Sequence, residues 1–354
     1  AIFVLATLSG ISVITKAARE KSKAQLLGVL ILLIGFQSLT QWLYYFGNIS
    51  AVLPEFKMNP FTFYYLNSIL FYHYVLKITG GVKNRKGLIA LYVVPAIEFL
   101  ILSFLFIRFQ ENIFKSYEQT YYIFYGVLIH IFSLGVLTLA LIRLFAYEKG
   151  IKQAYSDLEG KRVRWAKITA FCLCFLYAYY LFSAYFLYIF VNPYIYLSID
   201  AVLTIFVIQW MSHYGIKQSP PKESFDDLKE LSADSSEERL SAEDEKMFIE
   251  LEWSIVNDRH FTNSNLKIAD LSQVANLPAK QISKLINQST GKNFNQYINE
   301  FRINFAERLL KDEKYDQYSV EGIAQEAGFN SKSVFNSLFK SKTGKTPSEF
   351  RKSR

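Results

Sequence analysis

Seven long apolar stretches occupy the first 216 residues of this chain and restrict its fold more than any other feature. Crossing the hydrocarbon core of a bilayer takes a helix of about twenty apolar residues. Six stretches approach that length, and the first is short because the chain begins, without Met, inside an apolar run, so that we expect residues to be missing before Ala1. Lipid leaves exposed backbone groups without hydrogen bonds, so runs without strand alternation favour helices over a barrel. The sequence therefore predicts a bundle of seven transmembrane helices. They are Ile2–Thr15, Leu26–Phe46, Phe61–Ile78, Leu88–Ile107, Tyr121–Ile142, Ile168–Val191 and Tyr194–His213.

The charged residues divide the chain into three parts. Residues 1–216 carry 18 Lys and Arg against 9 Asp and Glu, residues 217–246 carry 5 against 10, and residues 247–354 carry 16 against 12. The acidic part also contains Pro220-Pro221 and a serine-rich patch, a composition typical of a solvated tether. We therefore expect a transmembrane domain at 1–216, an acidic flexible linker at 217–240 and a soluble all-helical domain at 241–354.

Basic residues between the apolar stretches predict the orientation of the bundle. Lys and Arg cluster after the first, third and fifth stretches, as at Lys16–Lys23, Lys77–Lys86 and Arg143–Lys167, and are scarce after the others. Basic loops remain on the cytoplasmic side. The pattern predicts an N-terminus outside and a cytoplasmic location for everything after His213.

Several ionisable residues lie at membrane depth, and we single out Glu98, His130 and Asp200 among them. Charge is costly there, so such residues are candidates for a functional site. Glu98 follows Pro95 in mid-stretch, and His130 is the partner that we expect for it. A signal-receiving site, for a ligand or a proton, is one interpretation; a carboxyl group that ties helices together and a transport path are the others. The stretches contain no phosphate-binding loop, metal-spaced cluster or nucleophile motif, so we expect neither a cofactor nor a metal nor an enzyme.

The end of the chain contains the same pattern of two helices and a break twice. The first break lies at Asn276, which tolerates left-handed geometry, and the helix after it ends at Gly291. The second break lies at Gly328, and its second helix runs from Ser331 to Gly344. A helix of residues 294–311 separates the two units and spans about 27 Å at 1.5 Å per residue. Two helix–turn–helix units so spaced can place their second helices in successive major grooves, which lie roughly 34 Å apart.

The exposed positions of these two second helices carry side chains that suit DNA. Lys donates to guanine, Asn pairs with adenine and Ser suits either base. The exposed residues are Lys280, Ser283, Lys284, Asn287, Lys332, Ser333, Asn336, Ser337 and Lys340. Phosphate contacts, which position a protein without recognising sequence, are expected at Lys292, Lys340, Lys342, Lys345 and Arg351. Double-stranded DNA is therefore the expected partner.

Three segments resemble the signature of the AraC family of regulators. They are Ser319-Val-Glu-Gly-Ile-Ala-Gln-Glu-Ala-Gly-Phe, Ser333-Val-Phe-Asn-Ser-Leu-Phe-Lys and Thr343-Gly-Lys-Thr-Pro-Ser-Glu-Phe-Arg. Phe294, Tyr297 and Arg302 also fit the family's linker helix, and the likeness covers about a quarter of the chain. Asn276 and Ile286-Asn287 depart from the family's usual residues in the first unit.

The resemblance implies a bacterial transcription regulator, and with the apolar half it implies a multi-pass protein of the inner membrane. It implies base contacts at Lys280, Ser283 and Lys284 in the first unit, and at Lys332, Ser333, Asn336 and Ser337 in the second. Our leading hypothesis is a one-component sensor, in which the bundle receives an unknown ligand or other signal and a homodimer answers at a promoter. The alternatives are a transporter or membrane enzyme with an appended regulator, and a passive anchor for a transcription factor.

Overall fold

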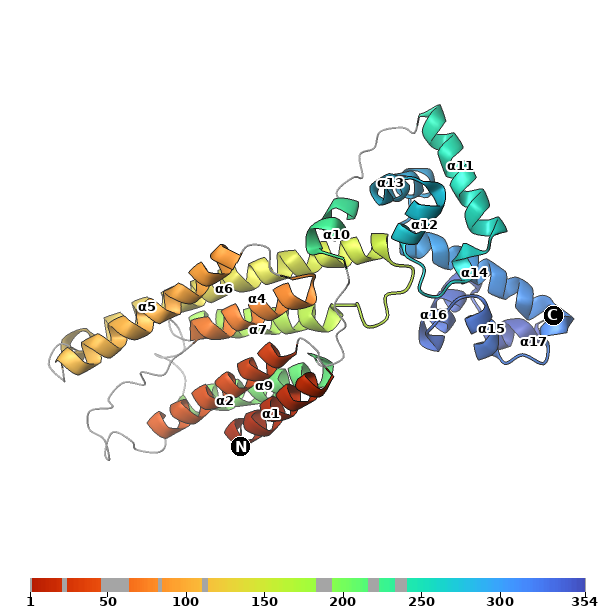
Figure 1. The fold of residues 1–354 in the computed structure, drawn as a ribbon. Helices are drawn as coiled ribbons and strands as arrows, with labels where there is room; N and C mark the ends of the chain where they lie inside the picture. The colour runs from red at the N-terminus through yellow and green to blue at the C-terminus, as the bar shows by residue number, and fades with distance from the viewer. Residues whose placement is uncertain are drawn as a thin grey trace. The chain divides into compact units, whose positions relative to one another are not determined.

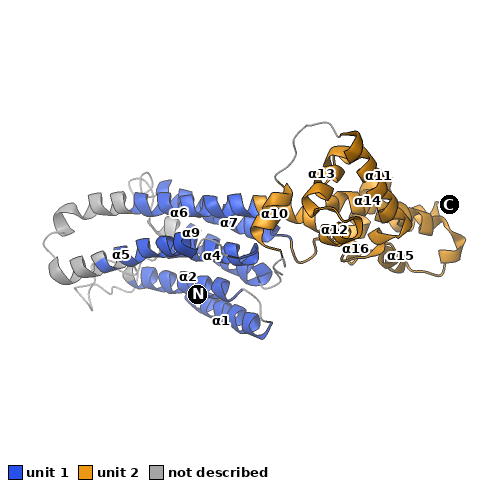
Figure 2. Cartoon of the chain, turned by 45° about the horizontal axis from the view of Figure 1, so that its top comes forward, with its two compact units in different colours: residues 1–145, 162–222 blue, residues 146–161, 223–354 orange. Residues whose placement is uncertain are grey.

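The structure is a computed structural model that describes eight segments of the chain. These are residues 2–20, 24–45, 64–81, 85–109, 114–182, 193–215, 223–232 and 241–353, without the side chains of 44–45, 64, 98–99, 101–109, 114–125 and 193–197. The described residues form helices and no strand, and a single antiparallel bridge joins Tyr155 to Lys267 (Figure 1). They fold into two compact units, residues 1–145 with 162–222 and residues 146–161 with 223–354 (Figure 2). The expected all-helical class is confirmed for these segments.

Unit 1 contains the apolar half of the chain. Its helices are α1 (Ile2–Arg19), α2 (Gln25–Tyr45), α4 (Tyr64–Ile78), α5 (Arg85–Phe109), the first part of α6 (Phe114–Ala154), α7 (Arg164–Phe182) and α9 (Pro193–Tyr214). Each of the seven expected stretches overlaps one of these helices, and residues 46, 61–63 and 183–191 of the stretches lie outside the described residues. Within the described segments, four helices are long and apolar enough to cross a membrane, at Ile2–Arg19, Gln25–Leu43, Gly126–Ala154 and Arg164–Phe182.

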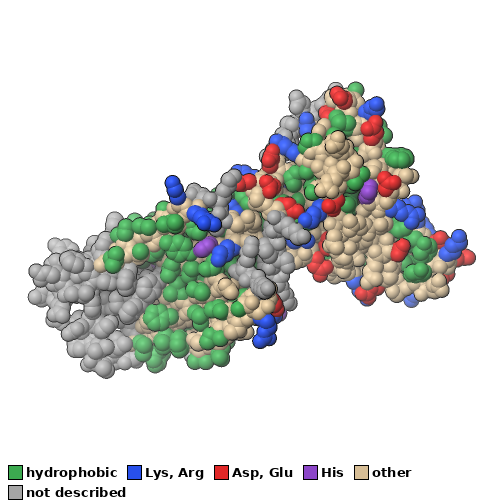
Figure 3. Space-filling model, in the orientation of Figure 1, with side chains coloured by type: hydrophobic (Ala, Val, Ile, Leu, Met, Phe, Trp, Pro, Cys, Tyr) green, Lys and Arg blue, Asp and Glu red, His purple; other side chains and the backbone are tan. Residues whose placement is uncertain are grey.

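The described surface of unit 1 carries many exposed apolar side chains. Leu8, Leu100 and Val202 are each about two-thirds exposed, and Figure 3 shows hydrophobic side chains gathered over this half. Small residues let helices approach closely, as they do inside membranes. A Cβ atom on Gly28 of α2 would lie 2.9 Å from the carbonyl oxygen of Gly10 in α1.

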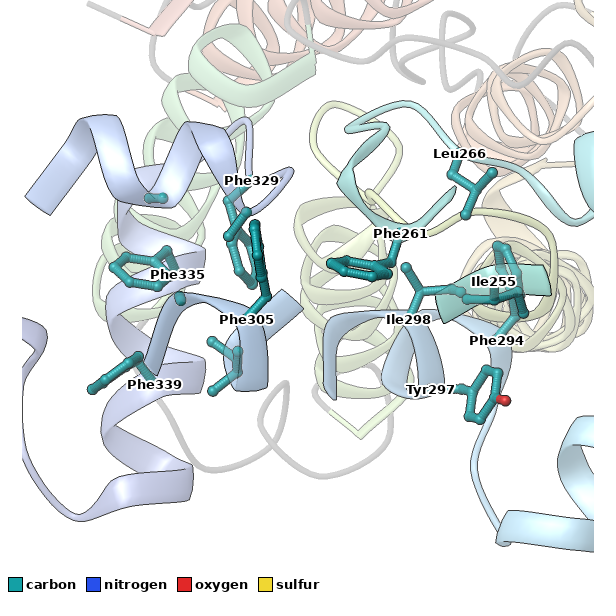
Figure 4. Packing of buried hydrophobic residues seen from close by; sticks show 14 of the residues in the cluster. Ile255, Phe261, Leu266, Phe294, Tyr297, Ile298, Phe305, Phe329, Phe335 and Phe339 are labelled. Atoms are coloured by element: carbon teal, nitrogen blue, oxygen red, sulfur yellow. The ribbon is translucent and has the colours of Figure 1, made fainter. Parts of the chain in front are cut away.

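Unit 2 is built around α14, the helix that the sequence predicts at 294–311. Its helices are α10 (Phe225–Ser232), α11 (Ala242–Asn257), η3 (His260–Thr262), α12 (Ile268–Ala275), α13 (Ala279–Thr290), α14 (Phe294–Lys311), η4 (Glu313–Tyr315), α15 (Val320–Glu326), α16 (Lys332–Thr343) and α17 (Pro347–Lys352). Phe294, Ile298 and Phe305 of α14 lie in one apolar cluster with residues of both helix pairs (Figure 4). One core therefore holds α12–α13 and α15–α16 on a common support.

The turns of unit 2 follow from residues that tolerate positive φ. Asn276 has φ 51°, and Gly291 and Gly344 end α13 and α16 at 67° and 75°. At Gly328, with φ 90°, a Cβ would lie 2.7 Å from the carbonyl oxygen of Thr262, so the second turn needs glycine for space as well as for conformation. The breaks expected at Asn276 and Gly328 are confirmed.

The structure differs from the expected division of the chain in two places. The expected flexible linker at 217–240 contains the helix α10, and its Leu228 is completely buried. Residues 146–161, which we assigned to the transmembrane domain, share a compact unit with residues 223–354. Both differences arise from long-range contacts. Leu228 of α10 packs against Gly150 of α6, and Ser156 forms hydrogen bonds with Leu266 and Arg302.

Candidate nucleic-acid interface and a cavity in unit 1

The second helices of the two helix–turn–helix units, α13 and α16, are the candidate recognition helices. Each has twelve residues and ends at a glycine in the left-handed region. The N-cap residue is Pro278 in α13 and Ser331, with extended backbone, in α16. Their positions therefore correspond one to one: Ser283 of α13 corresponds to Asn336 of α16, and Asn287 to Lys340. This correspondence allows the surroundings of equivalent residues to be compared.

The expected base-contacting surface of α16 is open. Lys332, Ser333 and Ser337 are exposed, and Asn336 is half-buried. The Lys332 Nζ lies 3.1 Å from a carboxylate oxygen of Glu321, and both side chains are more than half exposed. Exposed pairs of this kind contribute little, so the lysine can exchange its partner for DNA.

The corresponding surface of α13 is covered by other parts of unit 2. Ser283 is 1% exposed, which contradicts the expectation that it is free to contact bases, and its Oγ donates to the backbone carbonyl of Leu231 at 3.2 Å. Lys280 is exposed, and its Nζ lies 3.8 Å from a carboxylate oxygen of Glu230. Lys284 is half-buried. Burial of Ser283 comes from α10, which the sequence analysis treated as part of a linker.

The expected phosphate-binding residues lie at the surface of unit 2, and several already have acidic or polar neighbours. Lys340 and Lys345 are exposed. Lys292 pairs with Glu300. The Lys342 Nζ lies 3.8 Å from the Glu307 Oε1. The Arg351 Nη1 donates to the carbonyl oxygen of Tyr318 at 2.8 Å. These contacts orient the basic side chains, and at Arg351 they leave the Nε and Nη2 atoms buried without a hydrogen bond.

Arg302 connects the core of unit 2 to the segment that follows α6. It is 1% exposed, and its guanidinium donates to the carbonyl oxygens of Phe261 and Asn263, each at 2.7 Å, and to the Oγ of Ser156 at 2.9 Å. Burial lowers the pKa of Arg302 to about 10, and the nearby Asp157 acts in the opposite direction. The guanidinium therefore stays charged at neutral pH, and its burial is compensated by buried acceptors.

Residue Ser156 is held in unit 2 by further hydrogen bonds. Its amide and its Oγ both donate to the carbonyl oxygen of Leu266, at 3.1 and 2.7 Å. Its own carbonyl oxygen accepts from Asn295 Nδ2 at 2.7 Å. Nearby, Gln153 at the end of α6 donates to Asn287 Oδ1 at 3.1 Å and accepts from the amide of Phe294. Residues 153–156 are thus part of the fold of unit 2.

In unit 1, the structure brings His130 and Asp200 together through one tyrosine. The His130 ring stacks on Tyr180 with centroids 5.6 Å apart, and the Tyr180 hydroxyl donates to the Asp200 carboxylate. Asp200 is 9% exposed and also lies 3.5 Å from Thr204 Oγ1. The Glu98 side chain lies outside the described residues, so the expected pairing of Glu98 with His130 stays a prediction.

A small cavity lies beside Asp200, among α2, α4, α7 and α9. Its volume is about 60 Å³, and Gln37, Asn67, Tyr180 and Asp200 are among the residues that line it. Gln37 and Asn67 are 6% and 8% exposed; the Asn67 Nδ2 donates to the Gln37 Oε1 at 2.7 Å. The Gln37 Nε2 and the Asn67 Oδ1 make no hydrogen bond. The space suffices for about four water molecules or one small polar molecule.

Sequence reasoning missed the contribution of α10 and of residues 146–161 to the surroundings of α13. The apolar positions Leu228 and Leu231 are a helical signal within the acidic part, but eight residues give too short a pattern to outweigh its composition. Residues 153–156 carry no motif at all. Their role depends on which backbone carbonyls and amides face them after folding.

Comparison with known proteins agrees with the geometry of unit 2. Residues 271–353 match a family described as a helix-turn-helix domain. The chain is 32% identical to the Msm operon regulatory protein of Streptococcus mutans over 89 residues. These residues make up 25% of this chain and 31% of that protein. The chain is 40% identical over 72 residues to the uncharacterized transcriptional regulatory protein YesN of Bacillus subtilis, 20% of this chain and 19% of that protein.

A third relative, the transcriptional activator RhrA of Rhizobium meliloti, is 28% identical over 95 residues, 27% of this chain and 30% of that protein. The chain thus spans less than a third of the length of these relatives. No solved structure gives a significant match. The resemblance found in the sequence is confirmed: the C-terminal part of this chain is a helix-turn-helix domain of the AraC type, the type carried by transcriptional regulators.

Proposed function

We propose that this protein is a membrane-bound one-component transcriptional regulator. The helix-turn-helix domain binds double-stranded DNA through α13 and α16 on the cytoplasmic side of the bacterial inner membrane. The apolar bundle receives a signal and changes how that domain meets DNA. The tether is supported by the four helices suited to crossing a membrane within the described residues and by the positive-inside pattern of the loops.

One observation carries the signal control, namely the hydrogen bonding of the segment after α6 within the DNA-binding unit. A passive anchor needs no more than a tether. Instead, Ser156 donates to Leu266 and accepts from the buried Arg302, and residues 146–161 share a compact unit with 223–354. Since α6 is one helix from Phe114 to Ala154, a displacement along it reaches the domain through covalent structure.

The cavity beside Asp200 is the proposed site of signal reception. Gln37 and Asn67 each present a polar atom without a hydrogen bond at this cavity, and buried groups of that kind are costly unless something binds them. A signal can act here only by binding two states of the bundle with different affinity. Homodimerisation on DNA is part of the proposal, because two linked domains raise the effective concentration at a paired site.

Genome-wide mapping of bound DNA in living cells tests the function. We expect discrete bound sites for the full chain, and their loss when Lys332, Ser333, Asn336 and Ser337 are replaced together by alanine. A reporter fused to the C-terminus tests the tether: green fluorescent protein should fluoresce, and alkaline phosphatase at the same position should be inactive. Phosphatase activity, or bound sites that survive the four substitutions, would overturn the proposal.

The proposed signal site has its own test. Tyr180→Phe and Asp200→Asn both weaken the hydrogen bond between these side chains, so both should shift promoter occupancy in the same direction across growth conditions. Leu139→Ala, at a half-exposed position of α6, is the control. Occupancy that follows wild type in both variants would leave a passive anchor as the better description.

A further inference from the structure

We propose that α10 and the end of α6 are an intramolecular partner of the first recognition helix, and that they must leave α13 before it can enter a major groove. The described structure is then a closed state, with α16 available to DNA and α13 occupied. This inference rests on the proposed function, because it takes α13 to be a DNA-binding helix.

The contacts of α13 with its intramolecular partner lie along one face of the helix. Lys280 meets Glu230 at 3.8 Å, Ser283 donates to the carbonyl oxygen of Leu231 at 3.2 Å, and Asn287 accepts from Gln153 at 3.1 Å. Positions separated by three, four and seven residues share a helix face. It is the face on which the sequence placed the base contacts.

The second recognition helix shows that this burial is not a property of the repeat. Lys340 of α16 is exposed where the corresponding Asn287 of α13 is half-buried, whereas Ser333 and its counterpart Lys280 are both exposed. Asn336, which corresponds to the fully buried Ser283, is half-buried. The difference between α13 and α16 arises from α10 and the end of α6, for which α16 has no counterpart among the described residues.

For steric and electrostatic reasons, α13 cannot contact α10 and enter a major groove of DNA at the same time. A major groove is about 12 Å wide, and one helix with its side chains is about 10–12 Å across, so α13 cannot enter the groove with α10 on its leading face. Residues 223–231 also carry four acidic side chains and one lysine. They would place negative charge against DNA phosphates, which strongly attract cations and repel anions.

Within this partner, helix α10 packs closely against α6. Leu228 of α10 is completely buried. A Cβ atom on Gly150 of α6 would lie 2.5 Å from the carbonyl oxygen of Leu228 and 2.8 Å from its Cβ. Glu223, just before α10, pairs with Lys267 at 2.9 Å. Because α10 rests on α6, the position of α6 decides whether the face of α13 is covered.

Gly150→Ala is the sharpest test of this contact. The added methyl group meets backbone, so α10 has to move, while alanine is more favourable than glycine inside α6 itself. Gly135→Ala is the matched control on the same helix, since a Cβ there meets nothing within 4 Å. Neither change alters charge. Leu228→Ala is a second variant that weakens the same contact without adding bulk.

The measurement uses the full chain in lipid nanodiscs and duplexes enriched from a random pool by selection on the Gly150→Ala chain. We expect Gly150→Ala and Leu228→Ala to bind on the order of tenfold more tightly than wild type, because the apparent Kd falls as the competent fraction rises. Hydroxyl-radical footprints should widen from one groove to two successive grooves. Gly135→Ala should match wild type in both readouts.

Two outcomes would overturn the closed state: a wild-type footprint that already protects both grooves with the affinity of Gly150→Ala, or an equal gain in Gly135→Ala. Failure of every chain to select and bind any duplex would instead overturn the proposed function. Hydrogen exchange gives an independent check, since DNA binding should speed exchange of the amides of residues 225–232 when α10 is released. Slower exchange there, with α13 protected by DNA, would show that α10 stays in place.

Discussion

Replacing Arg302 by methionine measures how firmly the end of α6 is held in the DNA-binding unit. The guanidinium makes three short hydrogen bonds, at 2.7 Å to Phe261 and Asn263 and at 2.9 Å to Ser156. A hydrogen bond from a charged donor contributes about 1.5–3 kcal/mol. Methionine fills much of the same space, so the loss reports mainly the polar contacts.

Two acceptors keep other donors after the substitution, which limits the loss. The Asn263 carbonyl oxygen still accepts from the amide of Leu266 at 3.1 Å. The Ser156 carbonyl oxygen, which accepts a longer bond from Arg302 at 3.4 Å, still accepts from Asn295 at 2.7 Å. Release of a buried charge from desolvation also offsets part of the cost. Removing one member of a buried ionic or hydrogen-bonded group typically costs about 3–5 kcal/mol, and we expect a destabilisation in that range.

Hydrogen exchange on the full chain in nanodiscs is the suitable assay, because local opening is defined even where global unfolding is not two-state. The reporter is the Ser156 amide, which donates to Leu266 at 3.1 Å. At 1.4 kcal/mol per tenfold, its exchange should accelerate by about two to four orders of magnitude. Arg308→Met is the control, since Arg308 is exposed on the same helix over the ring of Phe305. An acceleration below about tenfold in Arg302→Met, or an equal one in both variants, would refute the reasoning.

Three further predictions concern other parts of the chain. Asn336→Ala should cost about 1–3 kcal/mol of affinity at a cognate duplex and relax preference at one base pair; an equal loss on every sequence in a competition assay would assign Asn336 to the DNA backbone. Thr346→Ala removes the hydroxyl that accepts from the amide of Glu349, and should destabilise α17 by about 1 kcal/mol, seen as faster local exchange with the rest of unit 2 unchanged. Gly28→Leu should abolish the close packing of α1 on α2 and reduce folded protein in fluorescence-detected gel filtration. Gly126→Leu, where a Cβ meets nothing within 4 Å, should not, and equal recovery of the two variants would contradict the packing argument.

Local signals in the sequence were strong enough to predict most of unit 2. Asn276, Gly291 and Gly344 stand where left-handed backbone is required, and the structure has positive φ at all three. The apolar spacing of residues 294–311 predicted α14 at its observed bounds. These features depend on neighbours within a few residues, which is why they can be recognised without tertiary structure. The apolar stretches of unit 1 are equally local, since their length alone identifies helices suited to lipid.

What the sequence could not decide is which surfaces meet after folding. Ser283 has the composition and spacing of a DNA-contacting residue, and its burial comes from Leu231, 52 positions away. The ties of Ser156 to Arg302 and Leu266 span still longer separations. Local composition determined that α13 and α16 have the same form. Only the tertiary structure decided that one carries a covering helix and the other does not, because burial of Leu228 against α6 depends on long-range packing that no periodic pattern encodes.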